Sequence, residues 1–292
     1  MTATGPLDPR LHAVRPDLAD VRLRGRVNAE RFVAGRPARV STPLLALRKL
    51  PRADAPLLTE AIHGEDVLIF DEPEGWAWLQ LADDGYVGYA EAAALTAPSG
   101  APTHRVTALR TFVYPGPDLK LPPVSWLPLN AQVALGEETV TRGTSYRHVT
   151  GGGAIASAHV VPLGALPASD FVAVAERFDG TPYLWGGKSA AGLDCSALVQ
   201  LSLAAAGMAV PRDTDLQEAA LTPLAGGLSG ALRRGDLVFW PGHVGILTAP
   251  DRLLHANAHH MAVAEESLDE AVRRIAARGT SVSSVRRPMA TG

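Results

Sequence analysis

One cysteine is the residue of this chain best suited to nucleophilic chemistry. Cys195 is the only cysteine among 292 residues and lies in the stretch GTPYLWGGKSAAGLDCSALVQL. The apolar run after it, which Gly207 can end, predicts a helix that begins near Cys195 with Ser or Asp as its N-cap. Backbone N–H groups at a helix start stabilise a thiolate. These residues are equally consistent with a buried structural thiol.

A thiolate catalyst needs a base, and the base needs a group that orients it. His243 opens the segment HVGILTA after a Pro-Gly turn, and His255 lies twelve residues further on, in LLHAN. Two antiparallel strands joined by a turn at APDR would bring His255 beside His243. The other histidines share no motif with this pair: His12, His63, His104, His148 and His159 precede Cys195, and His259 and His260 follow His255.

A metal site is the other chemistry that the histidines suggest. The stretch HANAHH contains His255, His259 and His260. The flanking segments read as strand or loop, and no Cys or acidic partner completes a zinc pattern. The sequence therefore predicts no metal and no other cofactor.

Composition indicates an ordinary globular protein. The chain is 47% hydrophobic and 20% charged with a formal net charge of −3, and its length suggests two or three domains. It has no Lys/Arg-rich run, so we expect neither nucleic-acid nor membrane binding. No apolar signal segment and no membrane-spanning run are found, which predicts a cytoplasmic protein, with a non-classical export route left open. A single cysteine allows no intrachain disulfide.

The pattern divides the chain into four parts. Residues 1–20 are Pro-rich and predict an arm, disordered or draped on the body; one or two helices are expected within 17–33. Short alternating runs in 21–97 predict a small barrel, and a second strand-rich block with a similar cadence occupies 98–166. Residues 167–292 mix helices with strands, starting with a helix in 168–178 capped by Ser169 or Asp170.

The third block resembles the NlpC/P60 cysteine peptidases. The pieces PYLWGG, DCSAL, PRDTDLQ, GDLVFW, GHVGIL and LLHAN occur in the family order and at family-like spacing. Ala197 stands where the family usually has Gly. The resemblance implies an α+β, papain-like catalytic domain preceded by two small SH3-like β-barrels, an architecture similar to that of γ-D-glutamyl-L-diamino-acid endopeptidases.

The resemblance also implies roles for individual residues. Cys195 is expected to be the nucleophile, His243 the base and His255 the residue that orients His243, by geometry more than by charge. Substrate-binding residues are expected at Tyr183, Asp194, Ser196, Thr214 and, from the first barrel, Tyr86, with Glu60 or Glu65 as a further partner of a substrate ammonium. From the residues alone, the favoured interpretation of Asp194, Ser196 and Thr214 is that of helix caps, and that of Tyr183 and Tyr86 is that of core aromatics.

These expectations combine into a cysteine endopeptidase that cleaves after γ-D-Glu in short murein peptides with a free N-terminal L-Ala, in cell-wall peptide recycling. The identity of the diamino acid and the oligomeric state are left open. One alternative is an amidase or acyltransferase of the same superfamily, with the same nucleophile and histidines. The other is a non-catalytic wall-binding module, against which the intact Cys195, His243 and His255 argue.

Overall fold

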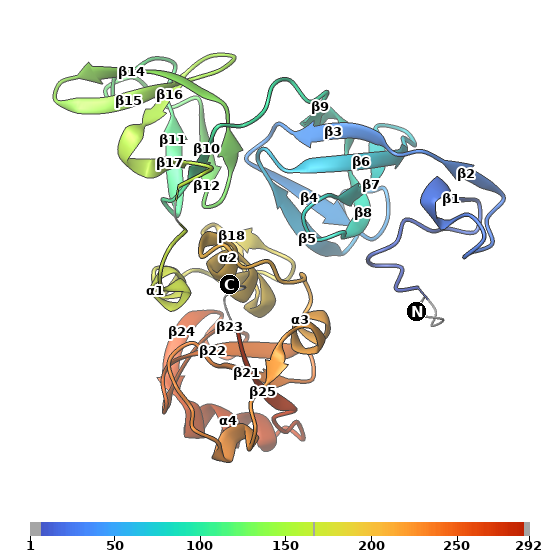
Figure 1. Cartoon of the computed structure of the whole chain (residues 1–292), viewed down its shortest axis with the longest axis vertical. Helices are drawn as coiled ribbons and strands as arrows, with labels where there is room; N and C mark the ends of the chain where they lie inside the picture. The colour runs from blue at the N-terminus through green and yellow to red at the C-terminus, as the bar shows by residue number, and fades with distance from the viewer. Residues whose placement is uncertain (1–6, 166, 289–292) are drawn as a thin grey trace. The chain divides into compact units, whose positions relative to one another are not determined.

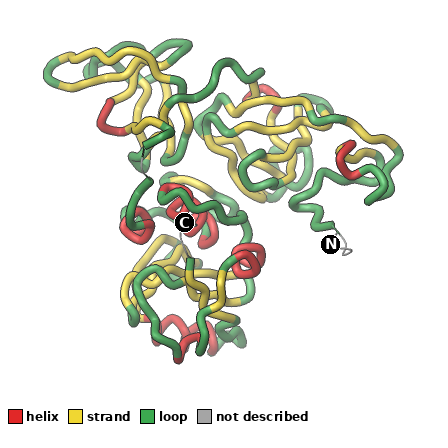
Figure 2. Tube along the Cα trace, in the orientation of Figure 1, coloured by secondary structure: helices red, strands yellow, loops and turns green. Residues whose placement is uncertain are grey.

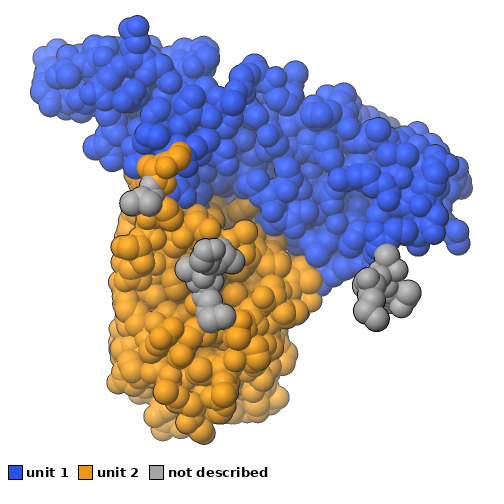
Figure 3. Space-filling model, in the orientation of Figure 1, with its two compact units in different colours: residues 1–106, 111–163 blue, residues 107–110, 164–292 orange. Residues whose placement is uncertain are grey.

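The computed structural model describes residues 7–165 and 167–288 and divides the chain into two compact units. The first comprises residues 1–106 and 111–163, and the second comprises residues 107–110 and 164–292, coloured separately in Figure 3. Figure 2 shows that strands dominate the first unit, whereas the second combines helices with strands.

The first unit begins with an antiparallel seven-stranded sheet in the order β5-β4-β8-β7-β6-β3-β9. Its strands are β3 (Arg36–Val40), β4 (Leu44–Arg48), β5 (Leu57–Ile62), β6 (Asp66–Asp71), β7 (Trp76–Leu81), β8 (Val87–Glu91) and β9 (Leu95–Thr96), with the 3-10 turn η2 (Ala92–Ala94) before the last. Alternate residues such as Leu47, Ile69 and Leu79 point into one buried cluster. Successive side chains of a strand point to opposite faces, so every second residue faces inward. These inward residues form the core of the sheet within the predicted range 21–97.

The expected helix within residues 17–33 is wrong. The structure has β1 (Leu18–Asp20), the 3-10 turn η1 (Val21–Leu23) and β2 (Arg31–Val33), with β1 parallel to β2. The chain turns at Gly25, whose φ of 80° lies in the left-handed region and interrupts any helix.

The described part of the N-terminal arm is packed on the barrel. Arg15 donates hydrogen bonds to Tyr89 Oη at 2.9 Å and to Asp71 Oδ2 at 2.6 Å. Its guanidinium also lies 4.4 Å from the ring centre of Trp78. Of the two states expected for this arm, residues 7–20 therefore show the draped one.

The second strand-rich block forms three small antiparallel sheets, ordered β13-β10-β17, β11-β12 and β14-β15-β16. The elements are β10 (His104–Val106), β11 (Arg110–Val113), β12 (Ser125–Pro128), β13 (Gln132–Val133), β14 (Leu135–Thr141), β15 (Thr144–Val149), β16 (Ala154–Ala156), η3 (Ser157–His159) and β17 (Val160–Pro162). Its identification as a second SH3-like barrel stays a prediction.

The second unit is built on an antiparallel six-stranded sheet in the order β20-β25-β21-β22-β23-β24. Its strands are β20 (Thr222–Pro223), β21 (Leu237–Trp240), β22 (His243–Ala249), β23 (Arg252–Asn257), β24 (Ala262–Ser267) and β25 (Ser284–Arg287). A two-stranded ribbon of β18 (Lys188–Ser189) and β19 (Gly192–Leu193) and the 3-10 turn η4 (Gly227–Ser229) lie outside this sheet.

Four α-helices of the described residues accompany the sheet: α1 (Phe171–Glu176), α2 (Cys195–Ala205), α3 (Thr214–Ala220) and α4 (Leu268–Ala276). Helix α2 packs against β22 and β23, and α4 packs against β23 and β24, with the sheet lying between the two helices in Figure 1. Leu268 and Ala271 of α4 share a buried cluster with Trp240, Leu247 and Leu253 of the sheet. No helix in residues 7–165 or 167–288 has the length and apolar character needed to cross a membrane.

Candidate active site

Cys195 is the first residue of α2, as the sequence predicts. The side chain of Asp194 caps this helix by accepting a hydrogen bond from the backbone N–H of Ala197 at 2.9 Å. After eleven residues the helix ends, and Gly207 with a φ of 77° turns the chain away. The thiol therefore lies in the first turn, where the helix dipole favours negative charge.

The environment of the thiol contains opposing influences. Burial and, to a smaller extent, the Asp194 carboxylate raise the pKa of Cys195 to about 12, although backbone N–H groups of Val244 and Ser196 and the charge of Arg212 act to lower it. The side chain is only 7% exposed. The thiol is therefore neutral in the unliganded protein and must lose its proton to a neighbouring base before it can attack. Since Val244 directly follows His243, its hydrogen bond to the sulfur places the backbone of the predicted base beside the nucleophile.

The two predicted histidines are in contact. The antiparallel pairing of β22 with β23 brings His243 Nε2 to 2.8 Å from His255 Nδ1. Gly245 of β22 lies against β23, and a Cβ there would stand 2.6 Å from a Leu253 methyl carbon and 3.2 Å from the Cβ of His255. The small residue in GHVGIL thus leaves room for the His255 side chain. The expected hairpin is confirmed.

A carboxylate and a guanidinium that the sequence analysis did not single out stand behind His255. Glu266 Oε1 lies 2.7 Å from His255 Nε2, and Arg274 of α4 donates to both oxygens of Glu266. Although burial raises the pKa of Glu266, hydrogen bonds from Arg274 and His255 lower it to about 2. Burial lowers the pKa of His243 to about 3 and that of His255 to about 4. At neutral pH the site therefore holds neutral imidazoles and an ionised carboxylate.

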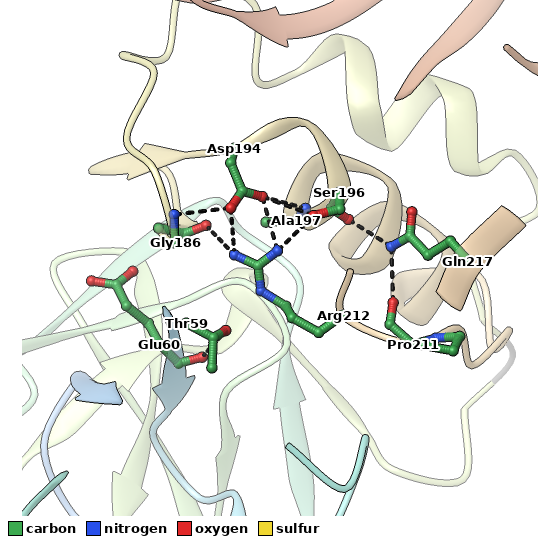
Figure 4. Close-up of polar contacts among 10 residues, drawn as sticks. Thr59, Glu60, Gly186, Asp194, Ser196, Ala197, Pro211, Arg212 and Gln217 are labelled. Carbon is green, nitrogen blue, oxygen red and sulfur yellow. Dashed lines mark hydrogen bonds and ion pairs between the residues drawn. The ribbon is translucent and has the colours of Figure 1, made fainter. Parts of the chain in front are cut away.

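A second buried ion pair lies on the cysteine side of the site. Figure 4 shows the Arg212 guanidinium facing the Asp194 carboxylate, with Nη1 2.9 Å from Oδ1 and Nη2 2.7 Å from Oδ2. Arg212 also donates to Ser196 Oγ at 2.7 Å and to the Gly187 carbonyl at 3.3 Å. The guanidinium therefore ties the start of α2 to the preceding loop. Arg212 belongs to the motif PRDTDLQ, but that motif does not predict which carboxylate the arginine pairs with.

Asp194 is occupied by neighbouring donors. Its oxygens accept hydrogen bonds from Gly186 N–H at 2.9 Å, from the hydroxyl of Ser196 at 3.1 Å and from Ala197 N–H, in addition to Arg212. A carboxylate offers about four lone-pair sites. In this structure Asp194 therefore caps the helix and anchors the preceding loop, which is the alternative role that its position in the sequence indicates. Its contact with a substrate ammonium stays a prediction and requires the displacement of one donor.

The remaining predicted residues of this unit lie around the start of α2 and α3. Burial raises the pKa of Tyr183 to about 12, and negative charge on Cys195 or Asp194 acts in the same direction. Thr214 is the half-buried first residue of α3. Gln217 of the same helix donates to the Ser196 carbonyl at 2.9 Å. The substrate-binding roles of these side chains stay predictions.

The candidates from the first barrel belong to the other unit. Tyr86 is 4% exposed within the barrel's hydrophobic cluster, as its alternative role of core aromatic anticipates. Glu65 is buried and accepts a hydrogen bond from the Ile62 N–H at 3.2 Å, whereas Glu60 is half-buried on β5. The structure of this unit gives Glu65 a role in a turn of the barrel. The binding roles of Tyr86 and Glu60 stay predictions.

The histidine-rich stretch has an acidic neighbour that the sequence did not reveal. His255, His260 and Glu266 offer ligand atoms within 4.8 Å of one another. Glu266 is, however, ion-paired with Arg274, and the guanidinium charge opposes a cation at this position. His260 is held by Asn257 Oδ1 at 3.1 Å.

Two family models match the chain. Residues 47–95 match the bacterial dipeptidyl-peptidase Sh3 domain, and residues 180–277 match the NlpC/P60 family. The chain carries an NlpC/P60 domain. The NlpC/P60 match begins just before Tyr183 and ends within two residues of the last helix, so it contains the cysteine, both histidines and both ion pairs described above.

Curated relatives support the same assignment. The chain is 35% identical over 99 residues to dipeptidyl-peptidase 6 of Lysinibacillus sphaericus, a match that covers 34% of this chain and 36% of that protein. It is 26% identical over 213 residues to a gamma-D-glutamyl-L-lysine dipeptidyl-peptidase of Bacillus cereus, covering 63% of this chain and 60% of the relative. The chain thus matches about a third of the first relative's length and less than two thirds of the second's.

A solved structure shows the same fold. The chain superimposes on an NlpC/P60 family protein of Bacillus cereus with a TM-score of 0.73 at 18% identity, over 86% of this chain and 99% of that one. The expected combination of an NlpC/P60 fold with an SH3-like domain is therefore confirmed. The chain is related to peptidases of this family.

Proposed function

We propose that this protein is a cysteine peptidase that hydrolyses the γ-D-glutamyl–L-diamino acid bond of short murein peptides with a free N-terminal L-Ala. The observation that carries the proposal is the buried thiol at the start of α2, next to the hydrogen-bonded histidine pair of β22 and β23. The matched dipeptidyl-peptidase Sh3 domain and the names of the relatives support this substrate class. Free peptides as substrates assign the enzyme to murein peptide recycling.

The first chemical step is attack on the γ-carbonyl of D-Glu. His243 takes the proton of the Cys195 thiol, and the sulfur bonds to the carbonyl carbon. The resulting oxyanion is stabilised by backbone N–H groups at the start of α2, close to the sulfur. The C–N bond then breaks, and the His243 imidazolium gives its proton to the leaving amine of the diamino acid.

The second step releases the dipeptide. A water molecule loses a proton to the now neutral His243 and attacks the thioester carbonyl. Collapse of this intermediate expels the Cys195 sulfur, which recovers the proton from His243, and L-Ala-D-Glu leaves. Every proton in the cycle passes through His243, so the hydrogen bonds that link His243 to His255 and His255 to Glu266 determine whether the site works.

The test is hydrolysis of L-Ala-γ-D-Glu-L-Lys and L-Ala-γ-D-Glu-diaminopimelate by the purified full chain, followed by mass spectrometry. We expect wild type to release L-Ala-D-Glu and Cys195→Ala to release none. The ratio of the two rates identifies the preferred diamino acid. An N-acetylated copy of the better peptide tests the requirement for a free amine.

Two outcomes would redirect the proposal. Equal cleavage of the acetylated peptide would remove the free-amine requirement and move the enzyme from recycling to wall remodelling. Failure to cleave any of the peptides, with Cys195 still alkylated rapidly at neutral pH, would favour an amidase or acyltransferase. An unreactive Cys195 would favour a non-catalytic wall-binding module.

A further inference from the structure

A chain of hydrogen bonds extends from His243 through His255 to Glu266 and Arg274. Its ring-to-ring link measures 2.8 Å, and its ring-to-carboxylate link measures 2.7 Å. His255 is fully buried, and the side chain of Glu266 is 10% exposed, so bulk water does not compete for these links. The two outer members come from β24 and α4, outside the motifs that marked the cysteine and histidines.

The chemistry of the donors gives this chain of bonds one direction. An ionised carboxylate only accepts hydrogen bonds, so the proton between His255 and Glu266 belongs to Nε2 of His255. A neutral imidazole carries one N–H, which leaves Nδ1 of His255 as an acceptor. The proton between the rings must then belong to Nε2 of His243. The nitrogen of His243 that remains without a proton is Nδ1.

We infer that Glu266 is a positioning residue that sets the tautomers of both histidines and thereby leaves His243 Nδ1 as the acceptor for the Cys195 proton. Without a carboxylate there, His255 could carry its proton on Nδ1 and donate to His243. His243 would then hold its own proton on Nδ1 and could not accept one from the thiol. The inference deepens the proposed function and rests on it for its catalytic meaning.

The same arrangement serves the charged state of the cycle. When the thiol proton reaches His243 Nδ1, the ring becomes an imidazolium that keeps its Nε2–H on His255. The negative charge of Glu266 lies one ring further on, and it stabilises this imidazolium through His255. A neutral His255 orients His243 by geometry more than by charge, and Glu266 supplies the negative charge that His255 lacks.

Arg274 holds the carboxylate in this role. Its guanidinium contacts both oxygens of Glu266, with Nη2 2.5 Å from Oε1. Such a bidentate pair fixes the plane of the carboxylate as well as its ionisation. Besides Glu266, the charged or titratable groups that act on His255 are His260 and Arg274. Both lower its pKa, so they disfavour a second proton that would charge the ring.

The preceding residue offers a matched control. Glu265 points to the other face of β24, where it accepts hydrogen bonds from Thr248 Oγ1 and from Arg252 Nε, each at 2.8 Å. Glu265→Gln removes the same charge from the same strand and weakens one ion pair. It touches neither histidine. Glu266→Gln keeps the size of the side chain but lets it either donate or accept.

The first readout is independent of any substrate. With ¹⁵N-labelled histidine in the full-length protein, we expect wild type to show His243 and His255 both protonated at Nε2 and both unprotonated at Nδ1. Glu266→Gln should give a mixture of tautomers, whereas Glu265→Gln should match wild type. A wild-type spectrum with protonated Nδ1 on His243 would overturn the inference, even if the variant does not fold.

The second readout is the reactivity of the only cysteine in the chain. The rate of Cys195 alkylation by iodoacetamide at neutral pH should fall on the order of 10-fold or more in Glu266→Gln, by analogy with the 10- to 100-fold losses seen when a metal-bound histidine loses its carboxylate partner. Glu265→Gln should alkylate as wild type does. Equal losses in both variants, or none in Glu266→Gln, would contradict the inference.

The peptidase assay then separates this inference from the proposed function. A fall in kcat/KM that arises from kcat, with KM unchanged, is the expected pattern for Glu266→Gln. If wild type cleaves no murein peptide while the tautomer and alkylation results hold, the substrate assignment fails and the positioning role of Glu266 stands. If wild type cleaves and Glu266→Gln is as active as wild type, the positioning role fails alone.

Discussion

The site contains two carboxylate–arginine pairs, and they do different things. Asp194–Arg212 is the more buried, with an Arg212 side chain 1% exposed, and its hydrogen bonds go to backbone and hydroxyl groups around the cysteine. Glu266–Arg274 is partly open, with an Arg274 side chain 22% exposed, and its remaining hydrogen bond goes to an imidazole. The first pair fixes where backbone groups lie, and the second fixes where protons lie.

The difference shows how one kind of interaction serves two purposes. In a buried ion pair surrounded by backbone N–H groups, substitution of either residue lowers the free energy of unfolding, because it leaves an uncompensated buried charge. In an ion pair whose carboxylate is hydrogen-bonded to an imidazole, the carboxylate charge changes the pKa of that imidazole. Stability should therefore depend most on the Asp194 side of the site, and activity should depend most on the Glu266 side.

The largest effect is expected for His243→Ala. Every proton transfer of the proposed mechanism uses this imidazole, so kcat/KM should fall on the order of 10⁴-fold or more. The free energy of unfolding should fall by about 1–3 kcal/mol, because the buried Nδ1 of His255 loses its hydrogen-bond partner. Peptide hydrolysis and urea unfolding measure the two quantities, and comparable activity in this variant would refute the role of the histidine side.

The next largest effect is expected for Arg212→Met. Removal of one partner from a buried pair should lower the free energy of unfolding by about 3–5 kcal/mol. Urea unfolding followed by circular dichroism measures the loss. The matched control is the double variant Arg212→Met/Asp194→Asn, which removes the stranded charge and should regain part of the stability. A double variant less stable than the single one would show that Asp194 does not need its arginine.

A smaller effect is expected for Arg274→Met. Its guanidinium is partly solvated, so the free energy of unfolding should fall by only about 1 kcal/mol. The pKa of Glu266 should rise, because the hydrogen bonds from Arg274 that lower it are lost. Unfolding in urea checks the first expectation and titration by NMR the second. A stability loss as large as that of Arg212→Met would erase the distinction between the two pairs.

The last predictions concern pH: the cysteine side and the histidine side of the site should lose stability at opposite ends of the pH scale. The pKa values of His243 and His255 are lowered by burial to about 3 and 4, so their contribution is complete above about 6.5 and is lost as pH falls toward those values. The pKa of Cys195 is raised from 9.0 to about 12, so its contribution is complete below 9.0 and is lost as pH rises.

Urea midpoints measured from acid to alkali test this assignment. Cys195→Ala should flatten the alkaline decline and leave the acid decline unchanged. His255→Asn should flatten the acid decline only. If Cys195→Ala alters the acid side instead, the ionisation states given to the site are wrong.

The residues near the nucleophile were predictable because their signals are local. A helix start at Cys195 and an N-cap at Asp194 follow from neighbouring residues, and the structure has both. The pairing of His243 with His255 needed only one hairpin. The one or two helices expected in residues 17–33 are absent because β1 pairs with β2, a contact between residues 13 positions apart, and the chain turns at Gly25 between them.

The partners of these residues were not predictable, because they depend on long-range register. Glu265 and Glu266 are adjacent and chemically identical in the sequence, and only strand pairing puts one opposite Leu254 and the other opposite Leu253, on the face of α4. Arg212 lies 18 positions from Asp194, and the two meet only because the chain turns back after the end of α2. No periodicity in the sequence reports either contact.

The hairpin of β22 and β23 makes the length of a turn part of the catalytic design. His255 reaches His243 because Ile246 pairs with Leu254 and Leu247 pairs with Leu253, with an irregularity before Ala249 that absorbs one residue. One residue added to or removed from this turn would shift the register and move His255 to the opposite face of the sheet. A shift of two residues would keep the face but move His255 about 7 Å along its strand, out of hydrogen-bond reach of His243. The hydrogen-bonded histidine pair therefore tolerates only insertions and deletions that the loop or a further bulge absorbs.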